Sequence, residues 1–127
     1  MKTCVMGDIH GAYKALVQVL KRANFDYAND TLIFLGDIAD WGPDTKLCVD
    51  ELLKIKHLII ILGNHDKWAL DWMETGWKGD IWVTQGGQAT LTAYSDGVPS
   101  THVAFFEQAL PYYIDKKIDY LFMQALS

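Results

Sequence analysis

The chain has 127 residues, half of them hydrophobic, with 11 basic and 16 acidic side chains and a formal net charge of −5. This composition is typical of one globular domain with a packed core and excludes an intrinsically disordered chain. The acidic balance argues against nucleic acid as the main partner, because nucleic acids select basic surfaces. No apolar run reaches the roughly 18 residues of a membrane span, and no signal peptide is recognised. We therefore expect a cytoplasmic protein without a membrane partner.

Apolar runs and helical spacings alternate along the first 75 residues. The pattern predicts strands at 3–6, 32–35 and 57–62, and helices at 12–22, 44–54 and 67–74. In the helix at 44–54 we expect four buried side chains, Leu47, Cys48, Leu52 and Leu53. Alternation of strand and helix predicts right-handed crossovers and a parallel sheet covered on both faces, so the fold class is α/β.

The second half has a different pattern. Residues 72–87 are rich in Trp and Gly and are predicted as a loop, whereas 88–94 is ambiguous and open to a helical interpretation. A helix is predicted from Ser100 or Thr101 to about Leu110. Two strands, 112–114 and 120–123, flank a turn at 115–117 and predict a hairpin.

The cysteines and two of the histidines are interpreted as structural. Cys4 and Cys48 fit no CxxC metal or redox motif, and free cysteines are usually buried packing residues. His57 opens a predicted strand and His102 opens a predicted helix. Both histidines lie away from the polar motifs described next and are interpreted as surface or core residues.

Three short polar boxes each follow one of the predicted strands: Gly-Asp-Ile-His-Gly at 7–11, Gly-Asp-Ile-Ala-Asp-Trp-Gly-Pro at 36–43, and Gly-Asn-His-Asp at 63–66. The carboxyl ends of parallel strands are where open α/β sheets bind ligands. Asp8 and His10 are two residues apart, a spacing that places both side chains on one side of extended backbone. Asp37 is a candidate bridging ligand, and Asn64 a neutral oxygen ligand.

These side chains suit divalent ions such as Mn, Fe or Zn. Two ions about 3.5–4 Å apart can generate hydroxide and hold a phosphoryl group. His65 is then placed to protonate a leaving oxygen, and Asp40 to orient the imidazole. A structural alternative remains for each residue. Asp and Asn after Gly also serve as turn residues, and Asp40 as a helix-approach residue.

The boxes resemble the calcineurin-like metallophosphoesterase signature GDxHG, GDxxDRG and GNH[DE], closely over residues 1–75 and loosely beyond. Within that family the chain is similar to the bacterial and phage serine/threonine-phosphatase-like branch. The resemblance implies a βαβ-sandwich hydrolase that cleaves phosphate monoesters, phosphoproteins included, with two divalent metal ions. It further implies metal ligation by Asp8, His10, Asp37 and Asn64, and an acid pair of His65 with Asp40.

Two departures from that branch concern the phosphate. Its second box reads Asp-Arg-Gly where this chain has Trp41, and an arginine often precedes its third box where this chain has Leu62. Forked guanidinium donors suit phosphate oxygens, and neither Trp nor Leu can replace them. Lys67 is an alternative cation, although a solvated lysine at the start of a helix is the favoured interpretation.

The family also has later histidine ligands, and no histidine follows His102 here. We therefore expect residues 1–127 to be one truncated metallophosphoesterase domain of doubtful activity that binds one ion weakly. A frameshift near residues 121–125 is one hypothesis for its cause. Two alternatives stay open: a non-catalytic metal- or phosphate-binding half-domain, completed by a separate C-terminal half or by a homodimer, and a dinucleoside-polyphosphate hydrolase.

Overall fold

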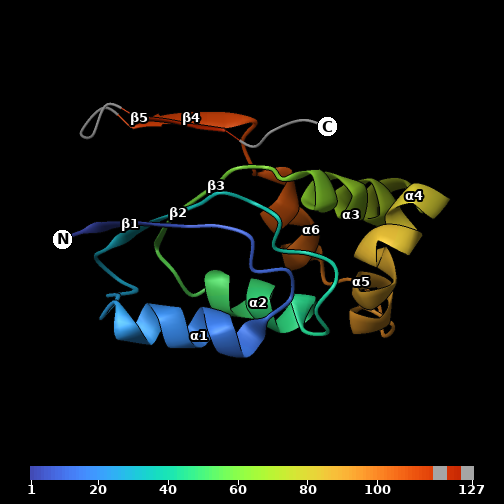
Figure 1. Cartoon of the computed structure of the whole chain (residues 1–127), viewed down its shortest axis with the longest axis horizontal. Coiled ribbons are helices and arrows are strands. Elements are labelled where there is room, and N and C mark those ends of the chain that lie inside the picture. Colours follow the sequence, from blue (N-terminus) through green and yellow to red (C-terminus); the bar gives the residue numbers. More distant parts are fainter. Residues whose placement is uncertain (116–119, 124–127) are drawn as a thin grey trace.

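A three-stranded parallel sheet organises the first half of the computed structural model, which describes residues 1–115 and 120–123. The strands are β1 (Thr3–Met6), β2 (Thr31–Phe34) and β3 (His57–Ile60), in the order β1-β2-β3. Helices α1 (Tyr13–Arg22) and α2 (Thr45–Leu52) make the two crossovers and lie together below the sheet in Figure 1. The alternating strands and helices predicted from the sequence are confirmed.

The main core lies between this sheet and the two crossover helices. Alternate residues of each strand point to one face, because the side-chain period of a strand is two. The face toward the helices carries Leu32, Phe34 and Ile60, which pack against Leu16 and Leu20 of α1 and against Cys48 and Leu52 of α2. Burial raises the pKa of the Cys48 thiol to about 12. Cys4 packs against the same core, so both cysteines are free packing residues as predicted.

Coverage of the opposite sheet face is uneven. Ile33 in the central strand is fully buried, whereas its neighbour in β1, Val5, is 44% exposed. The antiparallel hairpin of β4 (Tyr112–Asp115) and β5 (Tyr120–Met123) lies on this side of the sheet (Figure 1). The predicted cover on both faces therefore holds at β2 but not at β1.

The hairpin itself is confirmed as predicted. Of its predicted turn, residues 116–117 lie outside the described residues, as do 124–125 of the segment considered for a frameshift.

The second half is more helical than its sequence suggested. Helix α3 runs over Asn64–Thr75, and the predicted loop at 72–87 is wrong except at residues 76–79. That segment contains the end of α3, α4 (Asp80–Trp82) and the kinked helical segment η1 (Val83–Gly87). Left-handed glycines explain the error, because Gly76 ends α3 and Gly86 kinks η1 without stopping the helical path. Trp82 is fully buried there against Ala39 and Ala69.

Two further helices complete the helical second half of the chain. The ambiguous segment forms α5 (Gln88–Ala93), and α6 (Ser100–Glu107) follows as predicted. By contrast, Leu47 in α2 and Leu53 directly after it are 45% and 42% exposed, so the prediction of their burial is wrong. The helix turns its other face, with Cys48 and Leu52, to the core. His102 is buried and His57 is exposed. Within the described ranges, no helix has the length and apolar character needed to cross a membrane.

Candidate metal centre

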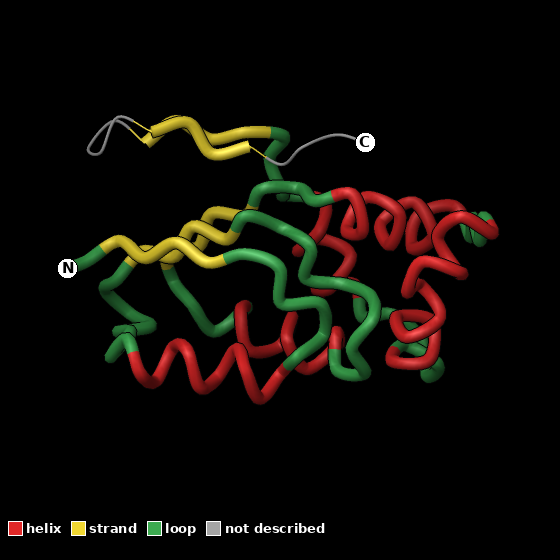
Figure 2. Tube along the Cα trace, viewed as in Figure 1, coloured by secondary structure: helices red, strands yellow, loops and turns green. Residues whose placement is uncertain are grey.

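The loops that follow β1, β2 and β3 meet at the carboxyl ends of these strands, a region called the loop edge below (Figure 2). Backbone hydrogen bonds join the first loop to the second. The amides of His10 and Gly11 donate to the carbonyls of Asp37 and Ile38 at 3.0 and 2.8 Å, and Gly42 N–H donates back to the His10 carbonyl at 2.9 Å. The first and second boxes, far apart in the sequence, are thus joined directly through their backbones.

Glycines allow the loops to approach this closely. A Cβ atom on Gly42 would lie 2.2 Å from the carbonyl oxygen of His10, and one on Gly63 would lie 2.4 Å from the backbone nitrogen of Asp37. Neither distance is sterically possible without movement of the backbone. The glycines of the boxes are therefore required by close approach of neighbouring loops, and the functional side chains are positioned by that approach.

Backbone strain is concentrated in the same loops. Of the six non-glycine residues with positive φ in the described part of the chain, five lie here: Asp8, His10, Asp37, Asp40 and Trp41. Each such residue costs roughly 1–2 kcal/mol relative to an ordinary conformation. Asp8 and His10 do share one side, but the extended backbone used to predict this is wrong. Two left-handed residues turn both side chains toward Asp37.

Asp8, His10 and Asp37 come together as a candidate ligand set. One ligand atom from each lies within 4.8 Å of the others. Nδ1 of His10 is 2.9 Å from the carbonyl oxygen of Ala39, which only accepts hydrogen bonds. That contact fixes the proton on Nδ1 and leaves the lone pair of Nε2 available, the usual arrangement of a metal-binding imidazole. The donor set therefore fits a divalent ion.

Asn64 is the first residue of α3 and not part of a strand end. The next residue of the same turn, His65, donates its backbone N–H to Oδ1 of Asp37 at 3.1 Å. This contact places the third box at the edge that carries the other candidate ligands. The sequence predicted the correct loop for Asn64, but placed the start of the helix three residues too late.

His65 and Asp40 form the predicted pair. Nδ1 of His65 lies 2.7 Å from Oδ2 of Asp40. A carboxylate accepts hydrogen bonds only, so Nδ1 carries the proton and Nε2 is the nitrogen available to a ligand. The imidazole also contacts the rings of His10 and Trp68, with centroids 5.1 and 5.2 Å away. The pair thus lies directly beside the candidate metal ligands.

Asp40 is fully buried and held by two residues from distant segments. Trp82 Nε1–H donates to Oδ2 at 2.7 Å, and the Thr90 hydroxyl donates to Oδ1 while accepting the Asp40 backbone N–H at 2.9 Å. Burial raises the pKa of Asp40, and the donors from Thr90, His65 and Trp82 oppose that rise. Sequence reasoning missed Thr90 and Trp82, because no local pattern connects them to a residue over 40 positions away.

A second buried carboxylate, Asp66, binds the backbone of the second and third boxes. It accepts four backbone N–H groups, from Asp37, Ile38, Ala39 and Gly63, at 2.7, 2.9, 3.1 and 3.3 Å. Burial raises its pKa to about 7. Sequence reasoning assigned Asp66 no role, although a carboxylate three residues after the cap position is a recognisable helix-start signal. Asp66 caps α3 and fixes the loop that carries Asp37.

The two positions that depart from the phosphatase branch differ in exposure. Trp41 is 59% exposed and stands beside His65, with ring centroids 6.3 Å apart. Leu62 is half-buried and donates its backbone N–H to the Leu110 carbonyl at 2.7 Å. Lys67 pairs with Asp71 on the exposed surface of α3, 3.5 Å apart, as a solvated helix lysine does. These three positions supply no guanidinium to the loop edge.

The family assignment follows from a comparison with known sequences. Residues 1–123 match the model of the calcineurin-like phosphoesterases. The chain belongs to this family. The resemblance noted in the three boxes is therefore confirmed, and it extends through the hairpin.

Individual relatives cover the chain only in part. Serine/threonine-protein phosphatase 1 of Salmonella typhimurium is 36% identical over 83 residues, which are 65% of this chain and 38% of that protein. The symmetrical bis(5'-nucleosyl)-tetraphosphatase of Proteus mirabilis is 41% identical over 70 residues, 52% of this chain and 24% of that enzyme.

A solved metallophosphoesterase from Sphaerobacter thermophilus has the same fold. It superposes with a TM-score of 0.61 at 24% identity, covering 89% of this chain and 42% of that one. The chain thus spans less than half the length of the relatives that it matches.

Proposed function

We propose that residues 1–127 form one metallophosphoesterase domain that carries the N-terminal ligands of a metal-dependent phosphate monoester hydrolase. Asp8, His10, Asp37 and Asn64 hold one or two divalent ions, with Mn²⁺, Fe or Zn as candidates. His65 and Asp40 form the proton-transfer pair. The observation that carries this proposal is the convergence of one ligand atom each from Asp8, His10 and Asp37 within 4.8 Å.

The chain's own residues have separate tasks in this reaction. A bound divalent ion supplies Lewis-acid polarisation of a phosphoryl oxygen. His65, with Nδ1 held by Asp40, presents Nε2 to the leaving oxygen and gives it a proton. Asp40 stabilises the imidazolium form, since its buried carboxylate lies 2.7 Å from the ring. Asp66 holds the loop that positions Asp37.

Both kinds of curated relative act on phosphate esters or anhydrides by their names, so the substrate is a phosphorylated molecule, protein or small. Because those relatives are longer, we propose that a C-terminal half or a second copy of the chain completes the ligand set. The acidic composition argues against a nucleic-acid partner, and a cytoplasmic location is part of the proposal.

The test measures Mn²⁺ content and hydrolysis of p-nitrophenyl phosphate in the same samples. Asp37→Asn replaces an anionic candidate ligand by a neutral, weaker one, and Asp71→Asn, an exposed aspartate of α3, is the matched control. We expect Asp37→Asn to lose bound Mn²⁺ and turnover, and Asp71→Asn to retain both. Metal bound without turnover would contradict hydrolysis by this chain and favour the half-domain alternative. Unchanged metal content in Asp37→Asn would contradict the ligand assignment.

A further inference from the structure

Trp41 is the feature of the loop edge that the proposed chemistry does not use. It combines two unfavourable properties, a side chain 59% exposed to water and a backbone φ of 66°. Left-handed backbone is costly for a bulky residue and persists only where its surroundings enforce it. Packing does not explain an exposed indole held in this conformation, whereas contact with a ligand would.

Contacts with the segment around Gly86 hold Trp41 in place. Its backbone N–H donates to the Gly86 carbonyl at 3.0 Å. Gly86 also packs against the indole, because a Cβ atom there would lie 2.7 Å from Cδ2 of Trp41. The segment that contains Gly86 is itself fixed to Asp40 through Trp82 and Thr90 on either side. The indole is therefore part of the same rigid assembly as the His65–Asp40 pair.

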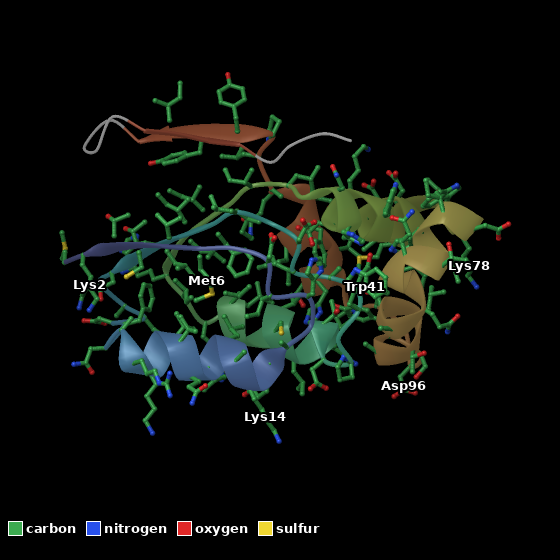
Figure 3. All side chains as sticks on the ribbon, viewed as in Figure 1. Lys2, Met6, Lys14, Trp41, Lys78 and Asp96 are labelled. Atoms are coloured by element: carbon green, nitrogen blue, oxygen red, sulfur yellow. The ribbon has the colours of Figure 1, made fainter. Side chains whose placement is uncertain are left out.

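The indole lies next to the proton-donating end of the site. Its ring centroid is 6.3 Å from that of His65, within the range of about 4.5–7 Å at which aromatic rings contact. Figure 3 shows Trp41 where the strand-end loops meet α4 and α5, on the far side of the molecule from Lys2. A ring bonded directly to a leaving oxygen at His65 would be within reach of the indole.

We propose that Trp41 selects phosphate esters whose leaving group is a planar aromatic ring, with aryl monoesters as the substrate class. This inference rests on the proposed function. Water adds across the ester, so that its oxygen bonds to phosphorus and the bond from phosphorus to the leaving oxygen breaks. The leaving oxygen keeps the electron pair and takes the Nε2 proton of the His65 imidazolium, which gives the phenol. The attacking water releases one proton to solvent, from which Nε2 is protonated again, and the other product is inorganic phosphate.

Trp41 replaces an arginine of the phosphatase branch, so recognition shifts from the phosphate to the leaving group. A guanidinium binds phosphate oxygens whatever ester they belong to, whereas an indole binds only flat apolar groups. A nucleobase is the other source of such a group. In a nucleotide, however, the sugar separates the base from the phosphate, and the 6.3 Å between Trp41 and His65 favours direct attachment.

The test measures binding without turnover. Calorimetry with MnCl₂ present compares phenylphosphonate, methylphosphonate and the non-hydrolysable phosphonate analogue of adenosine monophosphate on the whole chain. We expect phenylphosphonate to bind roughly two- to tenfold tighter than methylphosphonate, the range that one aromatic contact gives. Trp41→Phe should keep most of this preference, and Trp41→Ala and Trp41→Arg should lose it. Tyr112→Ala, an exposed aromatic of the hairpin, is the matched control and should leave the preference unchanged.

The outcomes separate this inference from the function beneath it. Equal binding of both phosphonates would overturn the selection by Trp41 and leave the phosphoesterase proposal intact, as would a preference that survives in Trp41→Ala. Tighter binding of the phosphonate analogue of adenosine monophosphate that depends on Trp41 would replace the aryl ester by a nucleotide. Failure of both phosphonates to bind would overturn the phosphate site and the inference together.

Discussion

Two histidine–aspartate pairs lie in different regions of this molecule, and their contact distances are the same. His65 contacts Asp40 at 2.7 Å at the loop edge, and His102 contacts Asp50 at 2.7 Å between α6 and α2. Their exposures are opposite. The Asp40 side chain is fully buried and that of His65 is 16% exposed, whereas the His102 side chain is 2% exposed and that of Asp50 is 53% exposed.

The second ring nitrogen distinguishes the two pairs. Nε2 of His102 donates to Asp50, and the Tyr94 hydroxyl donates to Nδ1 at 2.7 Å, so both nitrogens are used. Nε2 of His65 has no hydrogen-bond partner among the residues that the structure describes. A short contact with a carboxylate is therefore no sign of a working imidazole. The sign is a carboxylate that orients one nitrogen while the other remains available.

Exchange of each histidine for glutamine tests this distinction and has the largest expected effect. His65→Gln removes the proposed proton donor and should lower kcat for p-nitrophenyl phosphate about 10²–10⁴-fold. Its free energy of unfolding should fall by about 1 kcal/mol at most, because Trp82 and Thr90 still donate hydrogen bonds to the buried Asp40 carboxylate. His102→Gln should lower the free energy of unfolding by about 2 kcal/mol, since it replaces a buried ring and leaves the buried Tyr94 hydroxyl without its partner.

Steady-state kinetics and urea unfolding of both variants provide the measurement. His57→Ala, an exposed histidine of β3, controls for loss of a histidine as such and should change neither quantity. If His102→Gln lowered kcat as strongly as His65→Gln at full folding, the comparison of the two pairs would be wrong.

Removal of a carboxylate from each region sharpens the comparison at the level of stability. Asp66→Ala leaves four backbone N–H groups without their acceptor and should lower the free energy of unfolding by on the order of 4 kcal/mol. Asp50→Ala removes an exposed carboxylate and should cost about 1 kcal/mol. Asp66→Asn keeps one acceptor oxygen and should lie between them. Equal losses in both alanine variants, by urea unfolding, would contradict a supporting role for Asp66.

The sequence predicted the sheet and the location of its ligands, because those depend on local patterns. Apolar runs ending in glycine mark β1, β2 and β3, and the boxes follow them at once. The prediction for 72–87 is wrong because two glycines in left-handed backbone interrupt the helical spacing of the sequence. Gly76 ends α3, whereas Gly86 lies at a kink inside η1. Composition there suggested a loop, and tertiary burial of Trp82 decided otherwise.

The site was predictable in its first layer only. Asp8, His10 and Asp37 converge as expected, yet they do so through left-handed residues that no propensity favours. Thr90 and Trp82, which hold Asp40, come from a part of the chain with no recognisable motif. Long-range contacts of this kind follow from packing of the whole domain, and a single sequence carries no signal for them.

The smallest effect concerns Tyr94, which closes the structural pair on the side of α5. Tyr94→Phe removes its hydrogen bond to His102 and should cost about 1 kcal/mol near pH 7. Burial raises the pKa of Tyr94 above its usual value of 10, so above pH 10 the unfolded chain releases a proton that the folded chain keeps. Wild-type stability should therefore fall as the pH rises past 10.

In Tyr94→Phe the free energy of unfolding should fall less steeply with pH, because this phenol is absent. Burial also raises the pKa of Tyr27, so part of the fall should remain. Urea unfolding at several pH values from 8 to about 11 measures the slope, and Tyr112→Phe, on an exposed tyrosine, is the matched control. The two curves for wild type and Tyr94→Phe should approach each other as the pH rises. Parallel curves would mean that the Tyr94 hydroxyl is not buried in the folded protein, and the closed network around His102 would have to be abandoned.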